Sequence, residues 1–133
     1  MIISNQIIDN LIAEAKASPR LRKNYNLHAS TSDSVQRMFN AMEPGTIVPI
    51  HRHKSVNETM ILLRGKMKVI EYDENYSPIS TILDINSGNI GVHIKSCVWH
   101  TVEVLEEGTV VFEVKEGPYQ PLSEDDILPQ ELL

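Results

Sequence analysis

The sequence predicts an all-β fold, a sandwich or barrel of short strands, preceded by one short helix. Short apolar segments follow one another between residues 35 and 115, and a turn sequence ends almost every one of them. No segment with helical periodicity separates these strands. Many short, evenly spaced strands without intervening helices are typical of a sandwich or barrel and not of a parallel α/β sheet. The length of 133 residues suits one domain with a substantial core, so we expect a single domain over 1–133.

The helix is expected at residues 4–18. Ser4 or Asn5 can cap its first turn, and Pro19 ends it because proline disfavours the helical conformation of the residue before it. One face of this helix is apolar and consists of Ile7, Ile8, Leu11, Ile12 and Ala15. Residues 20–34 are polar and rich in turn formers, so 1–34 is expected to be a helix with an irregular lead-in to the barrel.

The barrel is expected at 35–117 and a tail at 118–133. The first strand is Val35–Met42, and Glu43-Pro44-Gly45 is a turn sequence. The later strands are expected at Thr46–His53, Glu58–Leu63, Lys66–Tyr72, Ile79–Ile85, Ile90–Ile94, Val98–Leu105 and Thr109–Lys115. Turn sequences separate most of them, at Arg64-Gly65, 73–75, 86–89 and 106–108. The tail carries three prolines and an acidic run.

Composition excludes several classes of function. The formal net charge is −6 and the basic residues are scattered apart from Arg20, Arg22 and Lys23, which argues against a nucleic-acid partner. That small cluster after the helix either holds an anion or is a solvated helix end. A single cysteine, Cys97, excludes an internal disulfide and fits a reducing compartment. The N-terminus does not have the pattern of a signal peptide, and no apolar run approaches the roughly 20 residues that span a bilayer. We therefore expect a cytoplasmic protein without a membrane partner.

The segment between Gly45 and Gly65 predicts a metal site. His51 and His53 are two residues apart, so on a strand both imidazoles leave the same face. Glu58 follows after a turn and comes within reach of the same point. Two imidazoles and a carboxylate with open positions are a ligand set of catalytic Zn, Fe and Mn sites. The fourth ligand must come from elsewhere in the chain.

His100 is the expected fourth ligand. It alternates with Val98, Val102 and Val104, which places its imidazole on the inner face of a sheet. A lone inward histidine would be read as a buried structural residue, but here two other imidazoles and a carboxylate point to the same interior. Burying these groups without a partner would cost several kcal/mol, and a divalent metal removes that penalty.

The same residues form a known motif. Gly45, His51, His53, Glu58 and Gly65 follow the spacing of the first cupin motif throughout. The second cupin motif, Pro-x-Gly-x-x-His, is altered: His100 is in place, but Lys95 stands at the proline position and Cys97 at the glycine position. The asparagine often found four residues after that histidine is Val104.

The whole chain resembles the WbuC family of small cupin metalloproteins found among bacterial polysaccharide genes. The resemblance rests on residues 24–28, 35–38, 49–53, 99–101 and 111–119. It implies a cupin double-stranded β-helix (jelly-roll) barrel, a divalent metal and a bacterial cytoplasmic setting, but it does not supply a reaction. In this context His28 is a candidate for the pocket rim, as a substrate contact or proton shuttle, and otherwise a surface histidine.

The orientation of two further charged or titratable side chains can be predicted from their position on the strands. Arg37 alternates with Val35 and Phe39, so it either points into the pocket, where it would bind a carboxylate or phosphate, or forms a salt bridge at a strand edge. His93 has the opposite parity to Val92 and Ile94 and is expected to face solvent.

The leading hypothesis is a metal-dependent enzyme that acts on a small polar molecule such as a sugar derivative. Its ligands would be His51, His53, Glu58 and His100, with His28 and Arg37 as substrate contacts. Iron, manganese, nickel and zinc all remain open, and so do isomerase and dioxygenase chemistry. The alternative is a non-catalytic, metal-containing module that binds a sugar or another small ligand. Exposed sheet edges favour a homodimer.

Overall fold

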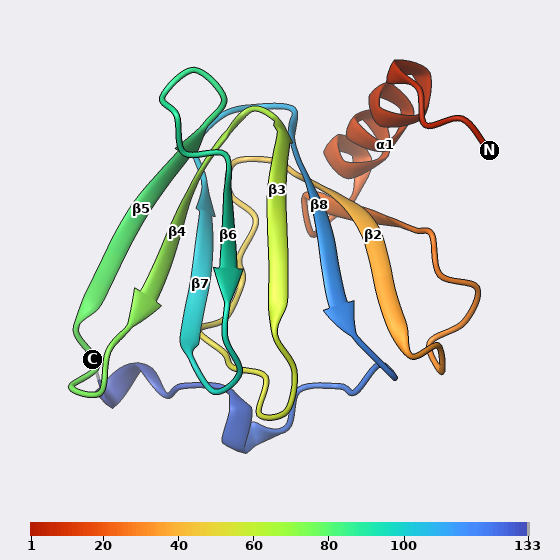
Figure 1. Ribbon diagram of the computed structural model, residues 1–133. Coiled ribbons are helices and arrows are strands. Elements are labelled where there is room, and N and C mark those ends of the chain that lie inside the picture. Colours follow the sequence, from red (N-terminus) through yellow and green to blue (C-terminus); the bar gives the residue numbers. More distant parts are fainter. Residues whose placement is uncertain (133) are drawn as a thin grey trace.

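Two antiparallel sheets face each other and enclose the interior of the molecule (Figure 1). The structure is a computed structural model and describes residues 1–132. The larger sheet has the order β1-β2-β8-β3-β6 and the smaller one β5-β4-β7. The elements are α1 Asn5–Ala17, β1 Arg22–Asn26, β2 Val35–Met42, β3 Glu58–Arg64, β4 Lys66–Tyr72, β5 Pro78–Asp84, β6 Gly91–Ile94, β7 Trp99–Val104 and β8 Thr109–Glu116. This confirms the predicted all-β jelly-roll barrel with a short N-terminal helix.

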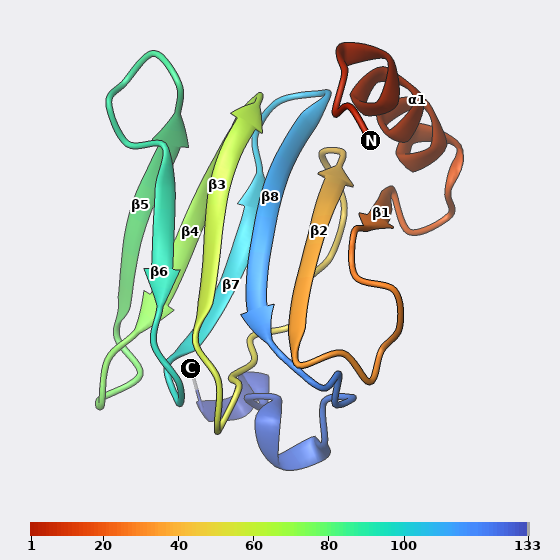
Figure 2. The ribbon, with the colours of Figure 1, turned by 45° about the vertical axis from the view of Figure 1, so that its right-hand side comes forward.

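The helix α1 lies beside β1 and β2 and packs on that part of the larger sheet's outer face (Figure 2). The Ser4 side chain caps it by accepting a hydrogen bond from the backbone N–H of Ile7 at 3.4 Å, and the helix ends just before Ser18-Pro19. Its apolar face is buried against β2 and β8, in a cluster of Ile8, Leu11, Ala15, Phe39, Ala41 and Val110. Consequently the parts of β2 and β8 next to the helix, at Phe39, Ala41 and Val110, are buried toward the helix, while other residues of the same strands face the barrel interior.

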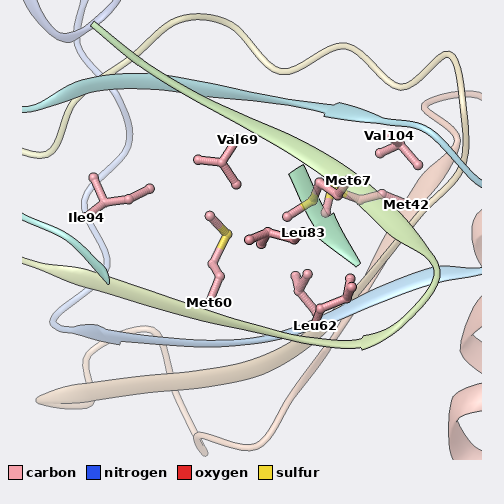
Figure 3. Packing of buried hydrophobic residues seen from close by; sticks show 9 residues of the cluster. Met42, Met60, Leu62, Met67, Val69, Leu83, Ile94 and Val104 are labelled. Carbon is pink, nitrogen blue, oxygen red and sulfur yellow. The ribbon is translucent and has the colours of Figure 1, made fainter. Parts of the chain in front are cut away.

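One part of the barrel interior is an apolar core. Side chains from both sheets meet there, and Figure 3 shows Met60, Val69 and Leu83 among them. The cluster consists of Met42, Met60, Leu62, Met67, Val69, Leu83, Ile94, Val104 and Val111. Unbranched methionine side chains suit the irregular space between two twisted sheets. The remainder of the interior is lined by polar residues and is open as a cavity.

Two of the secondary-structure predictions are wrong. Residues 20–34 were expected to be irregular, but Arg22–Asn26 forms β1 and pairs with β2. Thr46–His53 was expected to be a strand, but only His51 pairs there, in isolated bridges to His100 and Ile127. Pro49 lacks the N–H group that a continuous ladder needs. The other predicted strands agree with the structure to within one residue at each end.

The C-terminal segment after β8 crosses one end of the barrel (Figure 1). It contains two short 3₁₀ helices, Glu124–Asp126 and Gln130–Leu132. Its backbone is hydrogen-bonded to the segment that joins β2 to β3: the N–H of Leu128 donates to the carbonyl of Ile50 at 2.8 Å. The last residue of the predicted tail, Leu133, lies outside the described residues. Within residues 1–132, no helix combines the length and apolar character that crossing a bilayer requires.

Candidate metal centre

Four side chains from three segments converge at one end of the cavity. His51 and His53 come from the segment between β2 and β3, Glu58 is the first residue of β3, and His100 lies on β7. One ligand atom from each of them lies within 4.8 Å of every other. Glu58 and His100 are buried, whereas His51 and His53 are partly exposed. The structure thus brings together all four residues that the sequence analysis named as ligands.

The backbone fixes the tautomers of two of these imidazoles. Nδ1 of His51 lies 2.8 Å from the carbonyl oxygen of Pro49, and Nδ1 of His100 lies 2.9 Å from that of Val98. A carbonyl oxygen only accepts, so each Nδ1 carries the proton of the neutral ring. The Nε2 lone pair of each ring is therefore available to a metal, in the arrangement by which proteins orient histidine ligands.

Reciprocal backbone hydrogen bonds hold the ligand segments together. The N–H of His51 donates to the carbonyl of His100 at 3.0 Å, and the N–H of His100 donates to that of His51 at 2.8 Å. Nearby, the N–H of Cys97 donates to the carbonyl of His53 at 2.7 Å. Cys97 has a φ of 70°, the left-handed conformation that glycine adopts most easily. The altered second motif thus keeps the turn that precedes His100, although cysteine occupies the glycine position.

A carboxylate is surrounded by imidazoles in this centre. Oε2 of Glu58 lies 3.3 Å from Nε2 of His53 and 3.4 Å from Nε2 of His100. Burial alone would raise the pKa of Glu58, but in the metal-free site hydrogen bonding from His100 and His53 and the charge of a protonated His100 outweigh it and hold the pKa below its ordinary value. Glu58 in turn raises the pKa of His100 although burial opposes this, so a metal replaces the Nε2 proton of that ring. Burial and, next to it, the charge of the neighbouring His100 together lower the pKa of His51 to about 4. His51 is therefore neutral at physiological pH, as metal binding requires.

The four residues fit a divalent cation. Oε2 of Glu58 is buried without a hydrogen-bond partner, which is costly for a carboxylate unless a cation compensates it. Three imidazole nitrogens and one carboxylate oxygen are a donor set that suits Fe, Mn, Ni and Zn, with positions left for water or substrate. The site thus meets the chemical requirements for a metal, and the donor set is compatible with several of them.

The centre opens into a cavity of about 410 Å³ within the barrel. His28 lines this cavity, and its Nδ1 lies 3.1 Å from the backbone N–H of Arg37. The structure does not bring Arg37 itself to the cavity. Its side chain is exposed on the face of β2 that also carries Phe39, whereas Gln36 and Met38 face inward. His93 is exposed, as predicted.

Two buried polar residues in the cavity, Glu113 and Asn40, were missed by the sequence analysis, and Arg22 was noted there only as part of a basic cluster after the helix. Glu113 on β8 and Asn40 on β2 are buried, and Arg22 on β1 lines the same space. Nδ2 of Asn40 donates to Oε1 of Glu113 at 3.3 Å. Burial and, next to it, the charge of Glu58 together raise the pKa of Glu113 to about 7. A signal was present in the sequence, because Glu113 interrupts the apolar run 110–114 at the parity of the buried Val111.

The fold and the ligand set define the chain as a cupin-fold protein with a histidine–glutamate site. Its residues 3–83 match the protein family described as "Domain of unknown function (DUF6016)". Because this match covers more than half of the sequence, the chain belongs to that family. No curated protein matches the chain in sequence.

Solved cupin structures share the fold at low sequence identity. Oxalate decarboxylase from Bacillus subtilis at pH 4.6 is 19% identical with a TM-score of 0.58, and the match covers 82% of this chain and 27% of that one. The capsular polysaccharide assembling protein CapF from Staphylococcus aureus is 22% identical with a TM-score of 0.57, and covers 68% and 25%. KdgF from Halomonas sp. is 12% identical with a TM-score of 0.57, and covers 77% and 84%. The chain therefore spans about a quarter of the first two proteins.

Proposed function

We propose that this chain is a metal-dependent cupin enzyme that acts on a small polar molecule such as a sugar derivative. The observation that carries the proposal is the convergence of His51, His53, Glu58 and His100 within 4.8 Å at the end of a cavity of about 410 Å³. A cavity of this size lies in the usual range for small-ligand sites. Its lining is largely polar, which favours a polar ligand over a lipid.

The proposed cofactor is one divalent cation, with iron, manganese, nickel and zinc as candidates. Manganese has support from the fold, since one of the similar structures is that of Bacillus subtilis oxalate decarboxylase with its Mn(II) centers. When bound, such a cation polarises a carbonyl or hydroxyl group, lowers the pKa of bound water or, for iron, supports oxygen chemistry. Isomerase and dioxygenase reactions both fit this chemistry.

The chain's own residues would hold the cation and position the substrate. The carbonyls of Pro49 and Val98 keep two imidazoles in the tautomer that binds metal. His28 at the cavity lining is proposed as a substrate contact or proton shuttle, because its ring is fixed at Nδ1 by the backbone of Arg37 and its Nε2 is left for a ligand. Arg37 faces the opposite side of β2 and is not part of this proposal.

A non-catalytic binding module is the second candidate. One observation favours it. His28 is hydrogen-bonded to the backbone of Arg37, and Glu113 is hydrogen-bonded to Asn40. Neither of these titratable side chains is hydrogen-bonded to a metal ligand, as an acid–base pair at the metal would be. An enzyme predicts turnover of some carbonyl or sugar substrate. A binding module predicts a ligand-induced rise in melting temperature without turnover.

The finer assignments belong to the same proposal. We place the chain with the WbuC-type cupins of bacterial polysaccharide genes, a setting that agrees with the fold it shares with the capsular polysaccharide assembling protein CapF. A cytoplasmic homodimer completes the proposal. Its support is that the outer face of β3 exposes Ile61 and Leu63, which a second copy would cover.

The proposal is tested with a His53→Ala variant. We expect the purified wild-type protein to carry metal and to turn over a substrate found by screening small carbonyl and sugar compounds, and the variant to lose both. Full metal content in His53→Ala would contradict the assignment of the ligands. Metal in the wild type together with ligand-induced stabilisation, but no turnover with any compound that binds, would favour the binding module.

A further inference from the structure

Three buried polar atoms lack a hydrogen-bond partner in the part of the chain that the structure describes. They are Nε of Arg22, Oδ1 of Asn40 and Oε2 of Glu58. All three residues line the same cavity. Buried polar groups in proteins are almost always paired, and an unpaired one costs stability unless it serves a ligand. The atom of Glu58 is explained by the metal centre, whereas the atoms of Arg22 and Asn40 are not.

These two side chains lie on the same inner face of the larger sheet. On β1 the cavity is lined by Arg22, Asn24 and Asn26, and on β2 by Gln36, Met38, Asn40 and Met42. Asn24 is paired with Asn40 in the register of these two strands. Asn40 in turn donates to Glu113 on β8, the strand that separates β2 from β3 and Glu58. Polar side chains of β1, β2 and β8 therefore share this wall of the cavity with the metal ligand Glu58.

Arg22 is a cation in need of an anion. Burial lowers the pKa of its guanidinium and the neighbouring charge of Arg20 lowers it further, while Glu113 offsets only part of this effect. Among the ion pairs within residues 1–132, none joins Arg22 to a carboxylate. A partly buried guanidinium beside a second one is suited to a carboxylate or phosphate, which it binds through paired N–H groups.

Asn40 would bind a different chemical group of the ligand, a hydrogen-bond donor. Its carboxamide is more than nine-tenths buried, its N–H₂ group donates to Glu113, and its oxygen remains an acceptor without a donor. A ligand hydroxyl would supply that donor. An anionic group near Arg22 and a hydroxyl near Asn40 together describe a small anionic sugar derivative.

We propose that Arg22, Asn40 and Glu113 form an anchoring subsite for a small sugar derivative, with Arg22 binding its carboxylate or phosphate and Asn40 a hydroxyl group. The other end of the same molecule would reach the metal centre across the cavity. This inference rests on the proposed function and names its substrate class: hydroxylated and negatively charged. Neutral sugars lack the group that Arg22 binds.

The test measures binding of three probes to Mn²⁺-loaded protein by calorimetry at constant ionic strength and neutral pH. The probes are D-glucuronate, D-glucose 6-phosphate and neutral D-glucose. We expect at least one anionic probe to bind about tenfold or more tightly than glucose, since charge-assisted pairing with a guanidinium has that magnitude. The stronger anion identifies the carboxylate or the phosphate. Equal binding of glucose, or no binding of any probe, would overturn the proposal.

Matched variants locate the effect. Arg22→Gln is expected to abolish the preference for the anionic probe, whereas Lys23→Gln, which removes a charge from the exposed face of the same strand, is expected to retain it. Asn40→Leu is the second variant if Arg22→Gln does not fold, and it is expected to weaken binding of the same anion. An unchanged affinity in Arg22→Gln, or in Asn40→Leu, would contradict the subsite.

Metal content of the same samples separates this inference from the proposed function. Arg22→Gln with full metal and weakened anion binding supports the subsite. Wild-type protein that binds no metal but still prefers the anion, in a manner that depends on Arg22, would refute the metal-dependent function and leave the anchoring subsite standing.

Discussion

Oε2 of Glu58 and Nε2 of His100 lie 3.4 Å apart, although the two residues belong to different sheets. Glu58 begins β3 in the five-stranded sheet, and His100 lies on β7 in the three-stranded one. A cation bound between them would therefore join the two sheets at the polar end of the barrel. Because the apolar core fills the rest of the interior, the metal centre would act on stability as well as on chemistry.

Glu58→Gln is expected to weaken metal binding strongly. The substitution keeps the size of the side chain but removes the negative charge that faces two imidazoles. Loss of an outer-shell contact typically costs 10–100-fold in metal affinity, so loss of a ligand charge should cost more than about a hundredfold. Titration with Mn²⁺ or Zn²⁺ measures the effect. The control is Glu103→Gln on the exposed side of β7, and equal affinities of the two variants would contradict the role of Glu58.

Glu113 predicts that the metal-free protein loses stability as pH rises. Its pKa is raised to about 7 in the folded protein, first by burial and then by Glu58, against an ordinary value of 4.5. Between these values the unfolded chain has released the proton that the folded chain still holds. The unfolded state binds fewer protons, so the contribution of this group to the free energy of unfolding falls by about 3 kcal/mol between pH 4.5 and pH 7. Above pH 7 it levels off.

The matched variant is Glu113→Gln, which stays neutral at every pH. Urea unfolding of chelator-treated wild type and variant at pH 5 and pH 8 isolates the contribution of Glu113, because the other titratable groups are common to both. We expect the variant to lose less stability than the wild type over this range. An identical change in both proteins would show that Glu113 titrates normally.

Gly65 in the turn between β3 and β4 is expected to tolerate no side chain. Its φ is +84°, and a Cβ there would lie 2.6 Å from the Cα of Thr109. Gly65→Ala should therefore cost about 3 kcal/mol, from left-handed strain together with the backbone clash. Gly88 also has a positive φ, of +96°, but a Cβ there meets no atom within 4 Å. Gly88→Ala should cost about 1 kcal/mol. Equal losses in denaturant unfolding would contradict the packing at Gly65.

The ligands were predictable from sequence because their spacing encodes them. His51, His53 and Glu58 lie within eight residues, and His100 shares the parity of buried valines. The strand predicted around the first two histidines does not form, yet both rings still reach the centre. Isolated bridges of His51 to His100 and Ile127 replace the ladder, and contacts of this kind between distant segments have no local sequence pattern.

The strand β1 was missed because its inner face is polar. Strand prediction relies on alternating apolar residues, but Arg22, Asn24 and Asn26 face a polar cavity instead of a core. The prediction that Arg37 points into the pocket failed for a different reason. Its shared parity with Phe39 is correct, but α1 covers that side of β2, so parity with an apolar residue did not indicate the barrel interior.

Elemental analysis of purified wild-type protein, His51→Ala and His93→Ala tests the central claim most directly. His93 is the matched control, because it is exposed and its Nδ1 lies 2.8 Å from the hydroxyl of Thr59, away from the cavity. The metal centre predicts close to one divalent metal ion per chain in wild type and in His93→Ala, and loss of that metal in His51→Ala. Equal metal content in all three proteins, or no metal in any of them after incubation with Fe²⁺, Mn²⁺, Ni²⁺ and Zn²⁺, would contradict it.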